Sequence, residues 1–143
     1  MKDESRFVNV VGRILMASLF LVAGIRKLLT WKMMLAYFSG LGLPFPEIVL
    51  PLTIAVEIGG GVALIVGWRP RELSLILAAF TLFTALVAHR FWAADSAQFN
   101  NQLNHFFKNV ALTGGFLVLF SGAKYRLKNP QEANVGKETV TAP

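Results

Sequence analysis

Four long runs of apolar residues constrain this 143-residue chain more than any other feature. They are each about 18 or 19 residues long and cover residues 7–25, 48–66, 73–91 and 106–123. At 1.5 Å per residue, a helix of that length spans roughly the 30 Å hydrocarbon core of a bilayer. The runs therefore predict an all-α integral membrane protein, built as a four-helix transmembrane bundle.

The composition agrees with lipid as the solvent of this chain. Hydrophobic residues make up 55% of the sequence and charged residues only 15%, whereas soluble domains normally have about a quarter of their residues charged. A soluble bundle would also place charges opposite an apolar stripe, but the segment LILAAFTLFTALVA is apolar or weakly polar on all sides. We expect residues 1–128 to form one transmembrane domain, followed by a disordered polar tail at 129–143.

The net charge of +6 does not indicate a nucleic-acid partner, because the basic residues lie at the ends of the apolar runs. The chain contains no cysteine, which excludes disulfides, thiol chemistry and cysteine-bound metal. No metal site and no covalent cofactor are predicted. Electron transfer would then need a bound organic cofactor, a metal with other ligands, or a partner subunit. Haem held by His89 and His105 is an alternative, although no attachment motif is present.

The distribution of Lys and Arg predicts the orientation in the membrane. Eight of them lie with the two chain ends and the second loop, against five on the opposite side, with Arg13 set aside. Cytoplasmic segments carry the excess of positive residues, so both termini are predicted to be cytoplasmic. Between the first two runs, the segment WKMMLAYF is predicted to form a short interfacial helix.

One carboxylate lies inside a predicted span. Glu57 is nine residues from either end of the run 48–66, which places it roughly 14 Å deep. An ionisable residue at that depth is costly and normally faces the bundle interior. Arg13, inside the first run, is the expected partner. The pair either anchors a ligand or handles protons, or it only sets the helix register.

A second polar group is predicted at the side opposite the termini. His89 ends the third run, and His105, Lys108 and Asn109 lie at the start of the fourth. These side chains are expected to line the mouth of a cavity between helices. The simpler alternative for each of them is hydration at the membrane surface.

Small residues also repeat along the second run. Ala55, Gly59 and Ala63 recur at every fourth position, which predicts a face that a neighbouring helix approaches closely.

Five stretches of the chain, in their order and spacing, resemble the DoxX family of small four-helix bacterial membrane proteins. They are GRILMASLFLVAGIRKL, GLGLP, AVEIGGGVALIVGW, FTLFTALVAHRFW and FFKNVALTGGFLVL, within about residues 13–122. The resemblance implies a multi-pass protein of the bacterial inner membrane. It also implies a link to membrane redox complexes, since the family is named after a small subunit associated with archaeal thiosulfate:quinone oxidoreduction. The family's recurrent polar positions fall on Arg13, Lys27, Glu57, His89, Lys108 and Asn109.

These observations lead to one functional hypothesis and two alternatives. The hypothesis is an accessory subunit in the lipid bilayer that binds a quinone-like or other amphipathic molecule between its helices and serves a redox protein. A homo-oligomer is also compatible with the sequence. The alternatives are a small proton-coupled transporter or carrier, in which Glu57 cycles a proton, and a structural or assembly factor without a ligand. No enzymatic activity is assigned.

Overall fold

The computed structural model describes residues 2–128, with the side chains of residues 6–122. Within this part of the chain the structure contains five α-helices, one short 3-10 helix and no strand. The elements are α1 (Lys2–Leu29), α2 (Trp31–Gly40), α3 (Pro46–Val66), α4 (Pro70–Ala88), the 3-10 helix η1 (Phe91–Ala93) and α5 (Phe99–Lys128). The all-α prediction is confirmed. The predicted tail at 129–143 lies outside the described residues.

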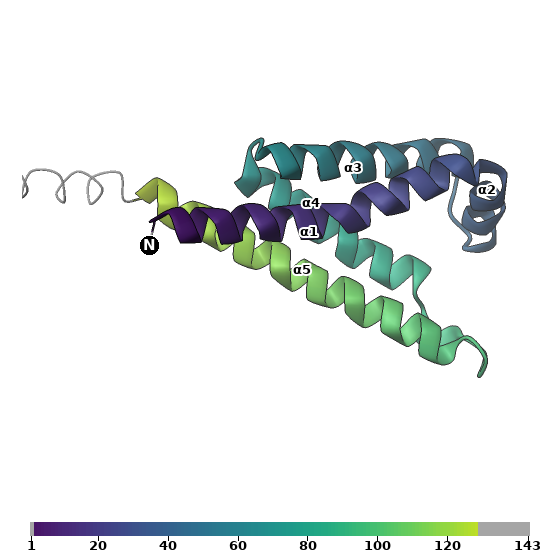
Figure 1. Cartoon of the computed structure of the whole chain (residues 1–143). Helices are drawn as coiled ribbons and strands as arrows, with labels where there is room; N and C mark the ends of the chain where they lie inside the picture. The colour runs from purple at the N-terminus through teal and green to yellow at the C-terminus, as the bar shows by residue number, and fades with distance from the viewer. Residues whose placement is uncertain (1, 129–143) are drawn as a thin grey trace, which may run out of the picture.

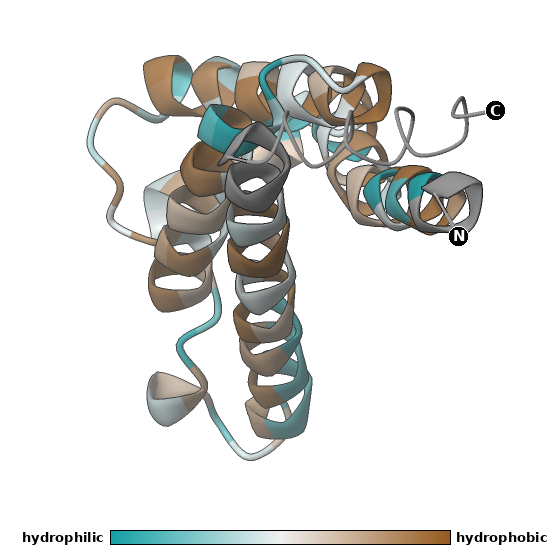
Figure 2. Cartoon of the chain, turned by 90° about the vertical axis from the view of Figure 1, so that its left-hand side faces the viewer, coloured by the Kyte–Doolittle hydropathy of each residue, from teal (hydrophilic) through white to brown (hydrophobic). Residues whose placement is uncertain are grey.

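Three segments are long and apolar enough to cross a membrane. They are Arg6–Leu29, Pro46–Val66 and Pro70–Ala93. No more than 33% of each apolar window is buried inside the protein, and large side chains such as Leu15 and Phe83 point outward. Figure 2 shows that hydrophobic residues predominate along these helices. An apolar surface of this extent marks contact with lipid.

The longest helix, α5, has 30 residues but is not among these three apolar segments. Polar residues crowd its first half: Asn100, Asn101, Gln102, Asn104, His105, Lys108 and Asn109. The fourth span at 106–123 therefore stays a prediction, as does the cytoplasmic location of the termini. Figure 1 shows that α1 begins and α5 ends at the same end of the molecule.

The long helices form two pairs that diverge toward one end. α1 packs along α3, and α4 packs along α5. Figure 1 shows the pairs close together near the chain termini, while α5 separates from α1 toward the end that holds α2. The main core, which includes Phe20, Leu77 and Phe116, joins the pairs. At the other end, α2 covers α3 through contacts of Phe38 with Leu50.

The turn between α3 and α4 is formed by Gly67 and the residues up to Pro70. Gly67 ends α3 with a φ of 75°, a left-handed conformation that glycine adopts without strain. The amides of Gly67 and Trp68 donate to the carbonyl oxygens of Leu64 and Ala63 at 3.3 and 2.9 Å, which satisfies the end of the helix. Pro70 then begins α4, and the two helices become antiparallel neighbours.

The predicted close-approach face on α3 is wrong. No atom lies within 4 Å of a Cβ built at Gly59, the centre of that face. α1 instead meets α3 at Gly24 and Gly61. A Cβ at Gly24 would lie 2.6 Å from Cγ1 of Ile58, and one at Gly61 would lie 2.9 Å from Cδ2 of Leu21. Because α3 is apolar all round, its small residues do not reveal which face a neighbour covers.

Candidate ligand-binding cavity

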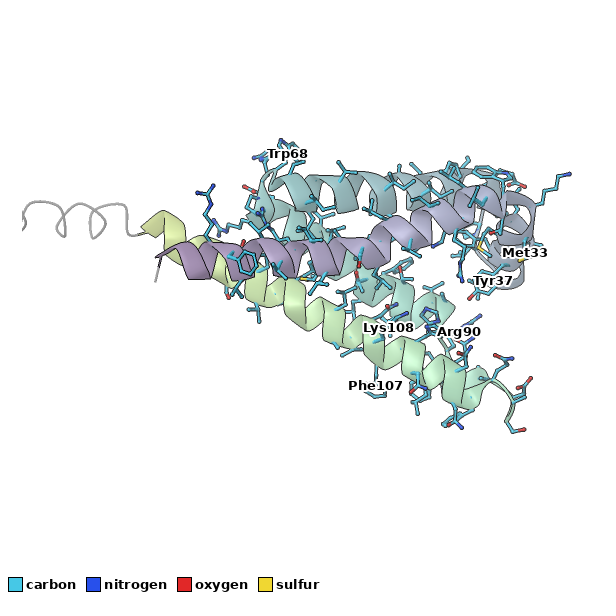
Figure 3. The ribbon with its side chains drawn as sticks, in the orientation of Figure 1. Met33, Tyr37, Trp68, Arg90, Phe107 and Lys108 are labelled. Carbon is cyan, nitrogen blue, oxygen red and sulfur yellow. The ribbon has the colours of Figure 1, made fainter. Side chains whose placement is uncertain are left out.

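The divergence of the two helix pairs leaves a cavity of about 460 Å³, lined by side chains from all five α-helices. This volume is within the range of sites that bind small molecules. The wall is mostly apolar, with contributions such as Leu19 and Phe20 of α1 and Met34 and Phe38 of α2. Figure 3 shows Lys108 of α5 beside the space between α5 and the α1–α2 end of the molecule.

An ion pair between α1 and α3 forms part of this wall. Nζ of Lys27 donates to Oε1 of Glu57 at 2.7 Å and to Oε2 at 2.9 Å. Glu57 is buried, with 6% of its side chain exposed, and Lys27 is partly buried, with 15% exposed. An ammonium that contacts both carboxylate oxygens offsets much of the cost of burying the two charges. Gly24, almost one turn before Lys27, lets α1 approach α3 closely enough for this contact.

The prediction that Arg13 is the partner of Glu57 is wrong. The Arg13 guanidinium lies against Gly67, which is ten residues, or about 15 Å along a helix, beyond Glu57. The error comes from the helix register. The first apolar run ends near residue 25, whereas α1 continues to Leu29 and places Gly24, rather than Arg13, opposite Glu57.

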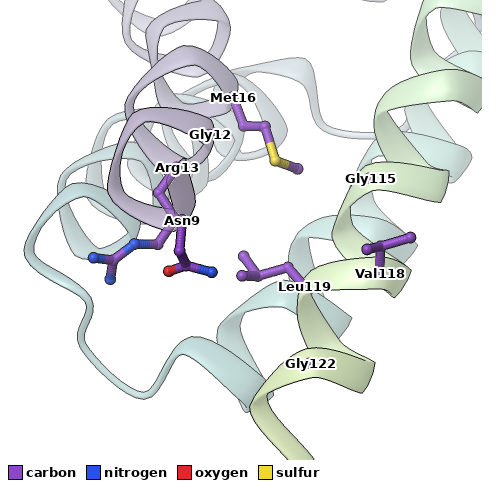
Figure 4. A pocket seen from close by; sticks show the side chains of 8 residues that line it. All are labelled: Asn9, Gly12, Arg13, Met16, Gly115, Val118, Leu119 and Gly122. Carbon is purple, nitrogen blue, oxygen red and sulfur yellow. The ribbon is translucent and has the colours of Figure 1, made fainter. Parts of the chain in front are cut away.

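Arg13 belongs instead to a smaller pocket at the end of the molecule that holds the termini. This pocket, of about 270 Å³, lies between α1 and α5 and is also lined by Asn9, Met16 and Leu119. Figure 4 shows Arg13 pointing away from α5. Its Nε atom is buried and has no hydrogen-bond partner within the described part of the chain. The cation lies at the C-terminal end of α3, where the helix dipole favours positive charge.

Two histidines stack at the cavity end of α4 and α5. The rings of His89 and His105 are 5.0 Å apart between centroids and inclined by 19°. Nδ1 of His89 is 3.1 Å from Oε1 of Gln102, and Nζ of Lys108 is 3.1 Å from Nδ1 of His105. An amide oxygen only accepts and an ammonium only donates. His89 therefore carries its proton on Nδ1, and neutral His105 carries it on Nε2.

This stacking does not fit the haem alternative, because two rings that overlap face to face cannot lie on opposite sides of one iron. No group of three or more His, Asp or Glu side chains suited to a metal ion occurs among the described residues.

Positive charge dominates the side of the cavity next to His105. Burial lowers the pKa of His105, which lies just before the predicted fourth span, and the charges of Lys108 and Arg26 lower this pKa further. His105 is therefore neutral at neutral pH.

On the opposite wall, burial raises the pKa of Tyr37, and its hydroxyl donates to the carbonyl oxygen of Ala88 at 3.1 Å. This bond connects α2 to the end of α4.

Asn109 is a buried residue at this cavity whose carboxamide makes no hydrogen bond within the described part of the chain. Its residue is 7% exposed and lines the cavity, yet its carboxamide has no hydrogen-bond partner among the described residues. The buried hydroxyls nearby are satisfied, because Thr81 donates to the carbonyl oxygen of Leu77 and Thr113 to that of Asn109. Buried polar groups are normally paired, so the Asn109 carboxamide is available to a ligand.

The structure brings most of the predicted site residues together. Lys27, Glu57, His89, His105, Lys108 and Asn109 all line the cavity, and Arg13 does not. Sequence reasoning missed Arg26, Tyr37 and Thr84, which also line it. Arg26 and Tyr37 lie between the first two apolar runs, outside the predicted spans. The residues between the first two spans carry only one weak signal of their role, namely that a helix over WKMMLAYF can fold back onto the end of the bundle.

Three apolar spans with lipid-facing surfaces, arranged around an internal cavity, define a multi-pass α-helical membrane protein. The chain belongs to the DoxX family, whose model matches residues 8–90. It is 39% identical over 110 residues to the inner membrane protein YqjF of Escherichia coli (strain K12), covering 77% of this chain and 79% of the relative. It is 26% identical, with the same coverage, to the inner membrane protein YphA of the same organism. No solved structure matches.

The family resemblance seen in the sequence is thus confirmed. The protein is a multi-pass protein of the bacterial inner membrane, as its relatives and its three apolar spans show.

Proposed function

We propose that this protein binds an amphipathic small molecule, such as a quinone-like ring with an apolar chain, in the cavity between its two helix pairs. One observation carries the proposal: an apolar cavity of about 460 Å³ has in its wall a polar group, Asn109, that makes no hydrogen bond within the described part of the chain. The Asn109 amide and Nε2–H of His105 can donate to carbonyl oxygens of such a ring. The chain of the molecule would pack against side chains such as Phe20 and Met34.

In this proposal the protein is a four-helix bundle with α5 as the fourth span and both termini in the cytoplasm. Two features support the fourth span. α5 packs along α4 and contributes Phe116 to the main core, while Leu117 and Val118 of the same helix face outward. The cavity then lies in the periplasmic half of the membrane.

The proposal also makes the protein an accessory subunit of a membrane redox system. The chain has no cysteine, so it supplies no thiol for electron transfer. Electrons would reside on the bound ligand and pass to a partner subunit. The family resemblance, through a namesake associated with quinone reduction, supports this assignment.

Binding of a short-chain quinone to the purified protein in lipid nanodiscs tests the proposal, with quenching of tryptophan fluorescence as the measurement. Thr84→Phe fills the cavity and should weaken binding about tenfold or more, equivalent to roughly 1.4 kcal/mol. Leu82→Phe, two residues away and outward-facing, should leave binding unchanged. The proposal fails if no quinone binds and the protein extracted from native membranes carries neither an amphipathic ligand nor a partner.

A proton-coupled carrier is the second candidate. It is favoured by the one-sided position of the cavity, because the core around Phe20, Leu77 and Phe116 closes the other end. Transporters alternate between states open to opposite sides. Uptake into proteoliposomes that is driven by a pH gradient and abolished in Glu57→Gln would favour a carrier. If Glu57→Gln changes only the stability and no ligand binds, the protein is a structural or assembly factor.

A further inference from the structure

The charges that line the cavity are not balanced. Arg26, Lys27 and Lys108 contribute three positive charges to the wall, and Glu57 contributes one negative charge. Both oxygens of Glu57 already accept hydrogen bonds from Lys27. Among the described residues, no carboxylate oxygen lies within 4.0 Å of the Arg26 or Lys108 nitrogens. The cavity therefore has two exposed cations, Arg26 and Lys108, without a carboxylate partner among the described residues.

Most hydrogen-bonding groups at the same place are donors, and the carboxamide oxygen of Asn109 is the acceptor among them. Arg26 and Lys108 carry only donors. His105 offers Nε2–H, because its Nδ1 accepts from Lys108. The Asn109 carboxamide adds two N–H groups with no partner in the described part of the protein. A ligand group bound here must accept several hydrogen bonds. A carboxylate accepts up to about four and donates none, and each bond is strengthened by charge.

We infer that the ligand is a single-chain amphiphile with an anionic head group, which lies among Arg26, Lys108 and Asn109. This inference rests on the proposed function, since it specifies the ligand of the same cavity. Arg26 and Lys108 are exposed at the edge of the cavity, where an anionic head group can reach them while its chain lies among the apolar side chains of the wall. A cavity of about 460 Å³ holds one apolar chain, whereas a two-chain phospholipid would extend far outside it.

Photolabelling in nanodiscs tests this inference. Hexadecanoate and hexadecanol, each with the same diazirine on the chain, are compared, and labelled peptides are mapped by mass spectrometry. Hexadecanoate should label the cavity helices at a concentration about tenfold or more below that of hexadecanol, because charge-assisted hydrogen bonds are roughly twice as strong as neutral ones. The preference should vanish in the double variant Arg26→Gln with Lys108→Gln.

Two control variants separate the head-group contacts from folding and from general charge. Lys32→Gln removes an exposed cation of α2 that does not line the cavity, and it should retain the preference. The conservative pair Arg26→Lys with Lys108→Arg keeps both charges and should also retain it. If the glutamine variant does not fold, each single glutamine variant is tested, and each should lose part of the preference.

Equal labelling by the two probes, or a preference that survives in the folded glutamine variant, would overturn the anionic head group. If a photoreactive phosphatidic acid labels the cavity at the same concentration as hexadecanoate, the inference of a single-chain ligand is wrong, while the inference of an anionic head group stands. Labelling that is insensitive to Thr84→Phe would place the ligand elsewhere and defeat the proposed function itself. Cavity labelling without head-group preference would defeat only this inference.

Discussion

Nζ of Lys27 lies 2.7 and 2.9 Å from the two carboxylate oxygens of Glu57, across the interface between α1 and α3. The contact occurs where the helices approach most closely, next to Gly24. It neutralises the one carboxylate of the cavity wall. The same ion pair thus fixes the register of two helices and determines which charges remain for a ligand.

Removing one partner of this ion pair should destabilise the protein strongly. Glu57→Gln leaves the Lys27 ammonium without its carboxylate, and Lys27→Met leaves the Glu57 carboxylate without its cation. Each change should cost about 3–5 kcal/mol. The double variant should cost clearly less than the two single changes added. Unfolding in mixed micelles with increasing dodecyl sulfate measures these free energies. Glu72→Gln is the control, because its exposed pair with Arg69, at 3.7 Å, contributes about 0–1 kcal/mol. Additive single effects would contradict direct coupling.

Adding a methyl group at Gly24 should destabilise the α1–α3 interface. The new Cβ would lie 2.6 Å from Ile58 Cγ1, so the Ile58 side chain or the helices must shift, at a cost of about 1–3 kcal/mol. Gly59→Ala on α3 is the matched control. It meets no atom within 4 Å and should be neutral or stabilise by up to about 1 kcal/mol through helix propensity. The same unfolding assay compares them, and equal effects would place the interface elsewhere.

His105 should titrate below the ordinary pKa of histidine, because burial and the charges of Lys108 and Arg26 disfavour its protonated form. Lys108→Met removes one of these charges and should raise the pKa of His105. In the natural protein, folded His105 binds fewer protons than unfolded His105 because its pKa is lowered. Protonation of His105 therefore reduces the free energy of unfolding as the pH falls through the pKa of the unfolded state.

Imidazole nitrogen NMR as a function of pH measures this pKa. The chain has two histidines, and His89→Gln assigns the signals. An unchanged His105 pKa in Lys108→Met would show that the ammonium does not contact the ring.

Single cysteines should report the orientation and the fourth span, since the natural chain has no cysteine and therefore no background. An impermeant maleimide added to intact spheroplasts should label Lys32→Cys and Asn101→Cys, and should label Glu72→Cys and Lys137→Cys only after lysis. These outcomes place α2 and the start of α5 in the periplasm. Labelling of Lys137→Cys in intact spheroplasts would show that α5 does not cross the membrane.

Features that depend on short stretches of chain follow from the amino-acid sequence alone. The length and hydropathy of the apolar runs specify helices that lie in lipid, because a bilayer core tolerates few other structures. Gly67 and Pro70 specify the turn between α3 and α4 through their backbone conformations. The depth of Glu57 in its run predicted a buried carboxylate, and 6% exposure confirms its burial.

Contacts between residues of different helices depend instead on how the helices pack in three dimensions. A helix that is apolar on all sides has no stripe to specify its packing face, so the register of α1 on α3 depends on the shapes of side chains around Gly24 and Gly61. That register selects Lys27 instead of Arg13 for Glu57. The divergence of α5 from α1 then opens the cavity and brings Arg26 and Lys108 to its wall, because contacts between distant segments are set by packing of the whole molecule.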